Sequence, residues 1–513
     1  MQNDPPIWRR LWCAETGLFL VVWLALMFCG RNMLLRDPGT YWHTVVGEQI
    51  LDGGEVVRED SFSFTNGGKP WVAHCWAAEV GMAAVYRHVG WDGLLLVTVT
   101  LLAAVYTLLG SRLFRAGLHP LPALLLMAMV LVASSHQFHA RPLIFTMVLL
   151  AVTFAILVDV ESGRGRLRRL WWIVPLTIFW ANVHGGVLAG LGSVGLVVGG
   201  WCAVKLFGSE GPIRQPRDLL AAGMVVLACC AVVLINPYGL DLPRTWWNTL
   251  TMPLPGLIQE HRPLDPTDPQ GLATILLGAG YLFALAGVLP KRPRITWLLP
   301  LVWFVLACQR IRHAPLFAIT AAIAAADLLP HTRWAEWLRG REMFAPPRED
   351  ETHGARWPAA ILPVLLIGAA IVLQAAHVSM PVIGRGWAGP DPSRFPVELV
   401  PELEQINAAA EPNEPIFNDL DFGGFVIFHA PRMRVFIDDR CALHGTELLN
   451  AYDDAWRNHP AKLDDWQREH GFRYALVRTG LNFDRHLKQS PEWTVVKRTA
   501  VGTLYRHSPE EEP

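Results

Sequence analysis

Long apolar runs recur from residue 15 to residue 377 and then stop. An α-helix needs about 20 apolar residues to cross the roughly 30 Å hydrocarbon core of a bilayer. We predict eleven membrane spans, at residues 15–34, 93–111, 120–138, 142–160, 170–181, 184–206, 218–236, 271–289, 295–309, 314–330 and 357–377. The 170–181 window is short, but it keeps the alternation of charged connections described next. The pattern predicts a polytopic α-helical membrane protein.

Lysine and arginine gather in every second connection between these spans. The basic residues are Arg9/Arg10, Arg112/Arg115, Arg164/Arg166/Arg168/Arg169, Lys205/Arg214/Arg217, Lys291/Arg292/Arg294 and Arg333/Arg339/Arg341. Positive residues favour the cytoplasmic side, so we expect these connections and the N-terminus to be cytoplasmic. The alternate connections, 31–92, 135–141, 182–184, 236–270 and 310–313, are then outside. The first span lacks a clear cleavage site and is interpreted as a retained signal-anchor.

The tail after the last span is polar and has no long apolar run. Helical spacing is found at 396–410, 446–457 and 460–470, and short buried strands are expected at 415–428, 434–438 and 472–478. Segments 493–498 and 502–506 predict a closing hairpin. We therefore divide the chain into a transmembrane domain at 1–377, with a long first outer loop at 35–92, and a soluble extracytoplasmic α/β domain at 378–513.

Composition narrows the function classes. The chain is 52% hydrophobic and only 17% charged, with a net charge of −1. No basic cluster is interleaved with aromatic residues, which argues against a nucleic-acid partner. Of eight cysteines, only Cys75 and Cys441 fall in predicted outer segments, and a disulfide between them is left open. Cysteine spacings typical of metal sites, such as CxxC, do not occur.

The first outer loop carries the densest candidate chemistry. Its titratable residues, among several tryptophans, are Asp37, His43, Glu48, Glu59, Asp60, His74 and Glu79. A carboxylate at the edge of the hydrocarbon, such as Asp37, is costly unless it is solvated, paired or used. The spacing Trp71-x-x-His74-x-Trp76-x-x-Glu79 predicts an amphipathic helix that begins at Trp71. Interfacial anchoring is the alternative explanation for the tryptophans.

The other outer connections carry histidines and arginines at the same predicted depth. They include His136, His139, Arg141, His184, Glu260, His261, Arg310, Arg312 and His313. A lone interfacial arginine usually extends its charge toward water. Five connections, far apart in the sequence, place polar groups on one face of the bundle. We therefore predict a single outer cavity lined by acids and arginines.

The membrane half resembles the GT-C superfamily of integral-membrane glycosyltransferases, which includes protein O-mannosyltransferases, aminoarabinose transferases and Rgt-like enzymes. The resemblance rests on many spans, a long first outer loop and an acid just after span one. The segments DPGTYWH, DSFSF and PWVAHCW, together with Asp421–Phe425 and Val435–Arg440, are similar to a bacterial subgroup of unassigned acceptor. Asp37 is followed by proline instead of completing an Asp-Glu pair. No WWDYG segment occurs, which argues against an oligosaccharyltransferase proper.

This resemblance implies a polyprenyl-phosphate sugar as donor and a glycan, lipid or protein as acceptor. Asp37 is the position of the catalytic base, with Asp60 as second choice. The candidate residues for binding the donor phosphate and the substrates are Arg141, Arg312, His313, His43, His74 and His184. Arginine suits phosphate because its fork of donors matches the oxygens and stays charged. No cofactor is assigned, and a divalent cation bridged by Asp37, Glu59 and Asp60 is left open.

Two other function classes fit part of the pattern. A lipid or solute transporter also has many spans, but it more often shows repeat symmetry and broken helices at mid-membrane. An inactive GT-C-like scaffold could act through its outer domain, for instance at Asp438-Asp439-Arg440. The expected location is the bacterial inner membrane, with a cytoplasmic N-terminus and an extracytoplasmic C-terminal domain.

Overall fold

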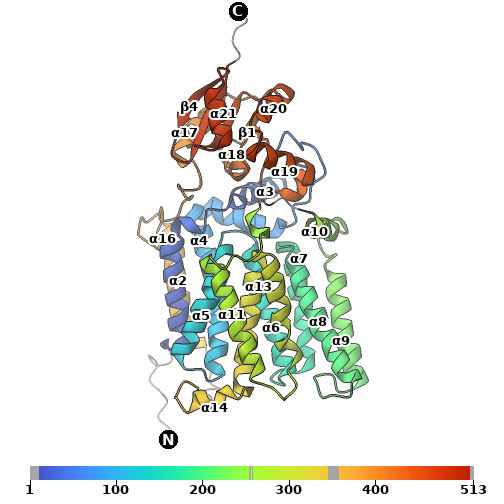
Figure 1. The fold of residues 1–513 in the computed structure, drawn as a ribbon. Coiled ribbons are helices and arrows are strands. Elements are labelled where there is room, and N and C mark those ends of the chain that lie inside the picture. The colour runs from blue at the N-terminus through green and yellow to red at the C-terminus, as the bar shows by residue number, and fades with distance from the viewer. Residues whose placement is uncertain (1–10, 254–255, 257, 345–356, 509–513) are drawn as a thin grey trace, which may run out of the picture.

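The computed structural model describes residues 11–253, 256, 258–344 and 357–508. A bundle of long helices lies at one end, and a domain that contains a β-sheet lies at the other (Figure 1). The cytoplasmic prediction for Arg9 and Arg10 falls outside the described residues. Among the described residues, the two predicted parts of the fold class, a polytopic helical bundle and a C-terminal α/β domain, are both present.

Every predicted apolar window coincides with a helix. These helices are α2 (Ala14–Met33), α4 (Trp76–Arg115), α5 (Pro120–Ser134), α6 (Leu143–Glu161), α7 (Ile173–Val183), α8 (Val187–Leu206), α9 (Pro216–Val232), α11 (Pro269–Ala286), α12 (Leu299–Gln309), α13 (Ala314–Leu328) and α16 (Trp357–Ala375). Within the described residues, eight of them are long and apolar enough to cross a membrane when α5 and α13 are taken with the short 3-10 turns that adjoin them, as Pro120–Gln137 and Ile311–His331. The exceptions are α7, α9 and α12, with 11, 17 and 11 residues. The protein is a multi-pass membrane protein, and the total of eleven spans stays a prediction.

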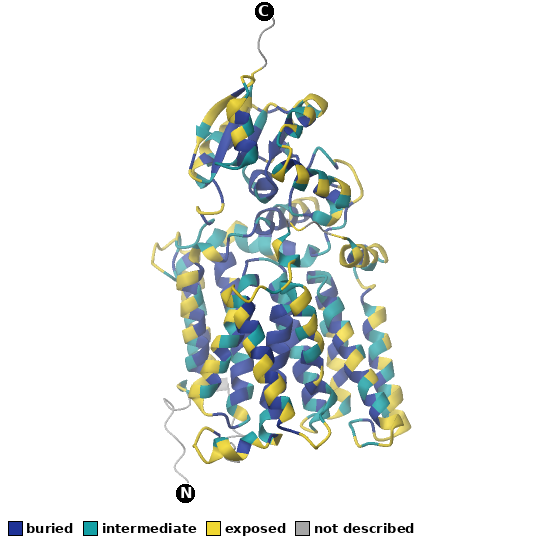
Figure 2. Ribbon diagram, in the orientation of Figure 1, coloured by how far each residue is buried: buried dark blue, intermediate teal, exposed yellow. Residues whose placement is uncertain are grey.

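The bundle exposes apolar side chains on its outside and buries its centre. Val21, Leu220 and Leu365 are each more than 60% exposed, and exposed positions follow the outer faces of the helices in Figure 2. In contrast, every residue of α13 is buried. A water-soluble protein seldom exposes so much apolar surface, so this surface is interpreted as the lipid-facing one.

Helices also lie across the end of the bundle that faces the C-terminal domain. There, α3 (Gly39–Gly53) and the first part of α4 run beneath that domain (Figure 1). The change of direction within α4 occurs at Gly90, which has φ of 67°, a conformation that only glycine adopts freely. The amphipathic helix that the sequence predicted from Trp71 begins later, at Trp76. Trp71 and His74 lie in the loop before it. The helix α10 (Asp241–Thr251) lies at the same level, whereas α14 (Trp334–Arg339) lies at the opposite end.

The C-terminal domain is built on a mixed five-stranded sheet of order β2-β1-β3-β5-β4. Its strands are β1 (Glu414–Asn418), β2 (Met433–Val435), β3 (Tyr474–Arg478), β4 (Trp493–Arg498) and β5 (Gly502–His507). Strands β2, β1 and β3 are parallel, and β4 and β5 form the predicted hairpin. Its helices are α17 (Val400–Ala409), α18 (Gly423–His429), α19 (Cys441–Arg457), α20 (Lys462–His470) and α21 (Asn482–Gln489).

One strand prediction was too long. The segment 415–428 is a strand only as far as Asn418, and its second half forms α18. The apolar residues Phe425, Val426 and Ile427 are all buried, and a short continuous apolar run does not by itself distinguish a strand from a buried helix.

The first outer loop and the C-terminal domain fold together. Phe62 accepts a hydrogen bond from the backbone of Val435 at 2.9 Å, and Phe64 donates one back to Val435 at 3.1 Å, so the loop extends the sheet beyond β2. In addition, α18 packs against α3. A Cβ atom on Gly424 would lie only 2.2 Å from the backbone oxygen of Pro38. Glycine at position 424 therefore permits direct contact between the two domains.

Replacing Gly424 by alanine should separate these domains. The new methyl group would meet backbone that cannot rotate away, and overpacking of this kind typically costs about 1–3 kcal/mol. We expect a lower thermal unfolding temperature in detergent and faster proteolysis between the domains. Gly389→Ala is the matched control, because no atom lies within 4 Å of the Cβ position there. Equal stability of both variants would contradict the docking described above.

Candidate active site

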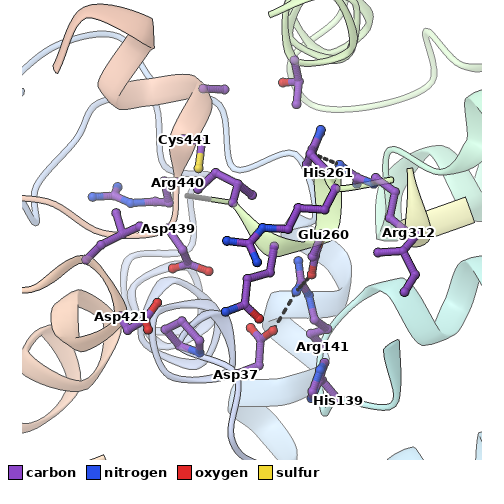
Figure 3. A pocket seen from close by; sticks show the side chains of 18 of the residues that line it. Asp37, His139, Arg141, Glu260, His261, Arg312, Asp421, Asp439, Arg440 and Cys441 are labelled. Atoms are coloured by element: carbon purple, nitrogen blue, oxygen red, sulfur yellow. Dashed lines mark hydrogen bonds and ion pairs between the residues drawn. The ribbon is translucent and has the colours of Figure 1, made fainter. Parts of the chain in front are cut away.

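A cavity of about 1370 Å³ lies between the helical bundle and the C-terminal domain. All five connections that the sequence placed outside contribute to it, through Asp37, Arg141, His184, Glu260 and Arg312. The C-terminal domain contributes Asp421, Asp439, Arg440 and Cys441. Figure 3 shows carboxylates and guanidinium groups from both domains that point into this space. The predicted convergence of the outer connections on one cavity is therefore observed.

Asp37 is held in place by the start of α3. Pro38 begins that helix, and the backbone N–H of Gly39 donates a hydrogen bond to Oδ1 of Asp37 at 2.8 Å. The residue is only 8% exposed. A Cβ atom on Gly39 would lie 2.8 Å from Oδ1 of Asp37 and 3.2 Å from Oδ2 of Asp439. The absence of a side chain at position 39 thus allows two carboxylates to approach the same point.

Arg141 links two acids from different connections. Its Nη1 lies 2.7 Å from Oδ2 of Asp37 and 2.8 Å from Oε1 of Glu260 (Figure 3). Burial alone would raise the pKa of Glu260, but the charges of Arg141 and Arg312 lower it to about 2. Glu260 therefore carries a negative charge at any physiological pH.

Asp439 is the second carboxylate near Asp37. It lies in the turn before α19, and its Oδ1 accepts a hydrogen bond from Nε1 of Trp42 at 2.7 Å. Burial and the negative charge of Asp37 raise the pKa of Asp439 to about 8. Of these two neighbouring acids, Asp439 thus holds its proton near neutral pH, as expected when two carboxyl groups share a small space.

Arg312 lies further along the cavity wall. Its Nη1 donates to Nε2 of His261 at 2.6 Å (Figure 3). Burial and the charge of Arg312 lower the pKa of His261 to about 4, so this histidine is neutral. The neighbouring His313 is not among the residues that line the cavity, and its Nδ1 lies 3.1 Å from the carbonyl oxygen of Leu306. Arg312, but not His313, can reach a ligand in the cavity.

Three predicted histidines line the cavity as neutral groups. Burial lowers the pKa of His43, His74 and His184. His43 contacts Oε1 of Glu79 through Nδ1 at 2.7 Å. His184 accepts a hydrogen bond from the backbone N–H of Gly186 at its Nδ1, which leaves its proton on Nε2. The rings of His43 and His184 are oriented by these neighbours, so each can present a fixed donor or acceptor to a substrate.

Asp60 has a different surrounding from Asp37. It is not among the residues that line the cavity. Its Oδ1 accepts from Nη1 of Arg440 at 2.7 Å, and its Oδ2 accepts from the hydroxyl of Ser63. Arg440 also binds Asp438 through two nitrogens. Asp60 therefore belongs to a buried ion-pair cluster that joins the first outer loop to the C-terminal domain.

The carboxylates considered for a metal do not gather. Glu59 is exposed, and Asp60 is engaged by Arg440. In the part of the chain that the structure describes, no group of three or more histidine, cysteine, aspartate or glutamate residues could hold a metal ion. Cys75 and Cys441 are both free thiols, so the disulfide left open from the sequence is not formed.

The sequence did not identify two acids of this site as catalytic or phosphate-binding residues. Glu260 was expected only among the polar groups of the outer connections, and Asp439 only in the Asp438-Asp439-Arg440 segment of an inactive scaffold. The short Gln259–His261 helix, η3, carries Glu260 into the cavity. A signal was present in each case, because both acids lie next to other charged residues in outer segments. Their distance in sequence from Asp37 hid their proximity in space.

Comparisons with known proteins identify the fold. No protein-family model and no curated protein matches the sequence. The oligosaccharyltransferase AglB from Archaeoglobus fulgidus, in complex with an inhibitory peptide and a dolichol-phosphate, matches over 97% of this chain and 75% of its own, with a TM-score of 0.55 and 10% identity. The apo form of the same enzyme matches over 90% of this chain and 69% of its own, with a TM-score of 0.55 and 11% identity. The mycobacterial arabinofuranosyltransferase AftD matches over 97% of this chain and 42% of its own, with a TM-score of 0.50 and 14% identity. At sequence identities this low, the structural matches show a shared fold alone.

Replacing Asp439 by asparagine should stabilise the protein in a pH-dependent way. Between the ordinary aspartate pKa near 3.8 and the value of about 8 in the folded chain, folding must keep a proton that the unfolded chain has lost. Wild-type stability therefore falls as the pH rises through this window. Asparagine keeps the acceptor for Trp42 and does not titrate. The variant should match the wild type near pH 4 and exceed its unfolding temperature increasingly toward pH 8.

Thermal unfolding in detergent, followed by tryptophan fluorescence, measures this difference. Asp465→Asn, at an exposed position of α20, is the control and should show an offset that does not vary with pH. Parallel curves for wild type and Asp439→Asn across pH 5–8 would contradict the charge state assigned to Asp439.

Proposed function

This chain has the fold of the GT-C glycosyltransferases, and on that premise we propose that it is a membrane glycosyltransferase. It would move a sugar from a polyprenyl-phosphate donor to an acceptor at the outer end of the bundle. The observation that carries the proposal is the 2.7 Å contact between Asp37 and Arg141 inside a cavity that Arg312 also lines. Acid and cations, which such a transfer needs, are together at the predicted membrane surface.

A lipid-linked donor suits the position of this cavity. The cavity lies at the end of the apolar bundle, so the prenyl chain can stay in the bilayer while the phosphate and the sugar enter between the domains. The AglB structure, in complex with a dolichol-phosphate, supports a ligand of this class. Arg141 and Arg312 are the proposed phosphate ligands, because a guanidinium group stays charged and matches phosphate oxygens.

In the proposed reaction, Asp37 is the general base. Its carboxylate takes the proton from the acceptor O–H or N–H as the acceptor atom attacks the anomeric carbon. The bond between that carbon and the phosphate oxygen breaks, and its electron pair stays on the released polyprenyl phosphate. Arg141 and Arg312 stabilise the charge that develops on the phosphate. The products are the glycosylated acceptor and polyprenyl phosphate, and Asp37 returns its proton to solvent.

The remaining predicted residues divide by position. The neutral rings of His43, His74 and His184 line the cavity and are proposed to orient the acceptor or the sugar. His313 faces a backbone carbonyl and is left out. Asp60 is also left out as a base, because it does not line the cavity and belongs to the buried ion-pair cluster of Arg440. The proposed location is the bacterial inner membrane, with the cavity on the extracytoplasmic side.

The two competing classes predict different chemistry from the same cavity. A transporter would move a ligand across the membrane, whereas these charged groups lie at one end of the bundle. An inactive scaffold would have no need of a buried base: Asp37 is 8% exposed and in contact with an arginine. A transferase uses an acid and cations in one cavity, so it is the class we propose.

Replacing Asp37 by asparagine tests the base. The isosteric amide cannot accept the proton, and loss of a general base typically lowers the rate by about 10²–10⁴-fold. The measurement is the release of polyprenyl phosphate, followed by mass spectrometry, in membranes that contain the lipid-linked sugars and glycans of the host. Binding of farnesyl phosphate should persist, because the arginines are unchanged.

Asp52→Asn is the matched control. Asp52 lies near the end of α3 and pairs with Arg87 at the surface, so this variant should transfer sugar at the wild-type rate. Undiminished transfer by Asp37→Asn at equal expression would remove Asp37 as the base.

A further inference from the structure

Glu260 lies among basic groups that a substrate phosphate would need for its own binding. Its Oε1 lies 2.8 Å from Nη1 of Arg141. Arg312 is also close enough for its charge to act on it, and the rings of His136 and His139 line the same cavity. A single carboxylate is thus surrounded by two guanidinium groups and two imidazoles, all from the connections that line the cavity.

The Nη1 atom of Arg141 already donates hydrogen bonds to carboxylates of the protein. Nη1 of a guanidinium group carries two hydrogens, and this atom contacts both Asp37 and Glu260. A phosphate that binds at Nη1 must therefore replace one of these carboxylates.

The two carboxylates are not held equally. Asp37 has a short side chain that is 10% exposed, and its other oxygen accepts the N–H of Gly39. Glu260 has a longer side chain that is 27% exposed, and it can turn away without moving the backbone. The anion that a ligand displaces more easily is therefore Glu260, and Asp37 remains in place to act as the base.

Nearby polar atoms have no partner in the protein. Within the described residues, both ring nitrogens of His136 and Nδ1 of His139 are buried and form no hydrogen bond. The same holds for both side-chain polar atoms of Gln137, which is 1% exposed. Buried polar atoms are nearly always hydrogen-bonded. Since His136 and His139 line the cavity beside Glu260, these atoms indicate a ligand with several acceptor oxygens.

We infer that Glu260 is an internal substitute for the donor's phosphate group. In the empty protein its carboxylate pairs with Arg141 and feels the charge of Arg312, and in the complex the phosphate takes its place, with the donors of His136 and His139 completing the site. Carboxylate and phosphate are interchangeable here because both accept charge-assisted hydrogen bonds from guanidinium groups. This inference rests on the proposed function and adds to it a residue that competes with the substrate.

The consequence is a gain of phosphate affinity when the competing charge is removed. A ligand that must displace Glu260 loses the energy of that ion pair. A hydrogen bond between two charged groups is stronger than one to a neutral amide, so Glu260→Gln should bind phosphate about tenfold more tightly than the wild type. A residue that merely supported the fold would not produce tighter binding when it is substituted.

The experiment measures binding of farnesyl phosphate and of inorganic pyrophosphate to the full chain in detergent, by microscale thermophoresis. The variants are Glu260→Gln and Glu260→Ala, the latter because it also vacates the space. Each is combined with Arg141→Gln, which should abolish the gain. Asp241→Asn is the matched control, since this exposed carboxylate of the same connection pairs with Arg244 and is not among the residues that line the cavity, and it should change affinity less than about twofold.

Comparison of the two ligands identifies the source of the phosphate. An equal gain for both shows a site that binds the phosphate group alone, and a gain for farnesyl phosphate only shows a site built for the lipid; both support the inference. Wild-type binding that depends on Arg141 but is unchanged or weakened in Glu260→Gln would overturn the inference and leave the proposed function intact. Failure of the folded wild type and of both Glu260 variants to bind either ligand would overturn both.

Discussion

The buried ion pairs of Arg440 are the contact on which the site depends. Arg440 binds Asp438 within the C-terminal domain and Asp60 in the first outer loop, and its guanidinium group lies 4.8 Å from the centre of the Trp71 ring. Its side chain is only 2% exposed. Removing one partner of such a pair leaves an uncompensated buried charge, at a cost of typically about 3–5 kcal/mol. The two domains are therefore held in one relative position, and Asp439, the residue before Arg440, is carried to Asp37.

The cavity collects charges of both signs that partly neutralise each other. Asp37 and Glu260 share Arg141, whereas burial, together with the nearby carboxylate of Asp37, raises the pKa of Asp439. Histidines around these groups are neutral, because burial disfavours their charged form. Charges in such a partly dehydrated space act more strongly than in water. The charged groups of the cavity are thus held in fixed positions by their neighbours.

Much of the fold follows from local patterns. Apolar windows predicted the helices of the bundle because each window must satisfy its backbone inside lipid. Alternating basic connections predicted which loops share an end, and those loops do line one cavity. The pattern failed where two structures satisfy it equally: residues 415–428 changed from strand to helix at the Gly423-Gly424 pair. It also placed a helix start at Trp71, five residues early, because aromatic spacing alone does not locate a helix terminus.

The sequence by itself determined that Asp37, Arg141 and Arg312 lie at one end of a membrane bundle, because hydrophobic length and charge bias set the depth of each connection. Only the tertiary structure decided which acids meet. Asp60 was close to Asp37 in the chain but is bound by Arg440, whereas Asp439 and Glu260, far away in the chain, contact the groups around Asp37. Depth is a local property of each segment. Contact between segments depends on packing across hundreds of residues, which periodicity does not encode.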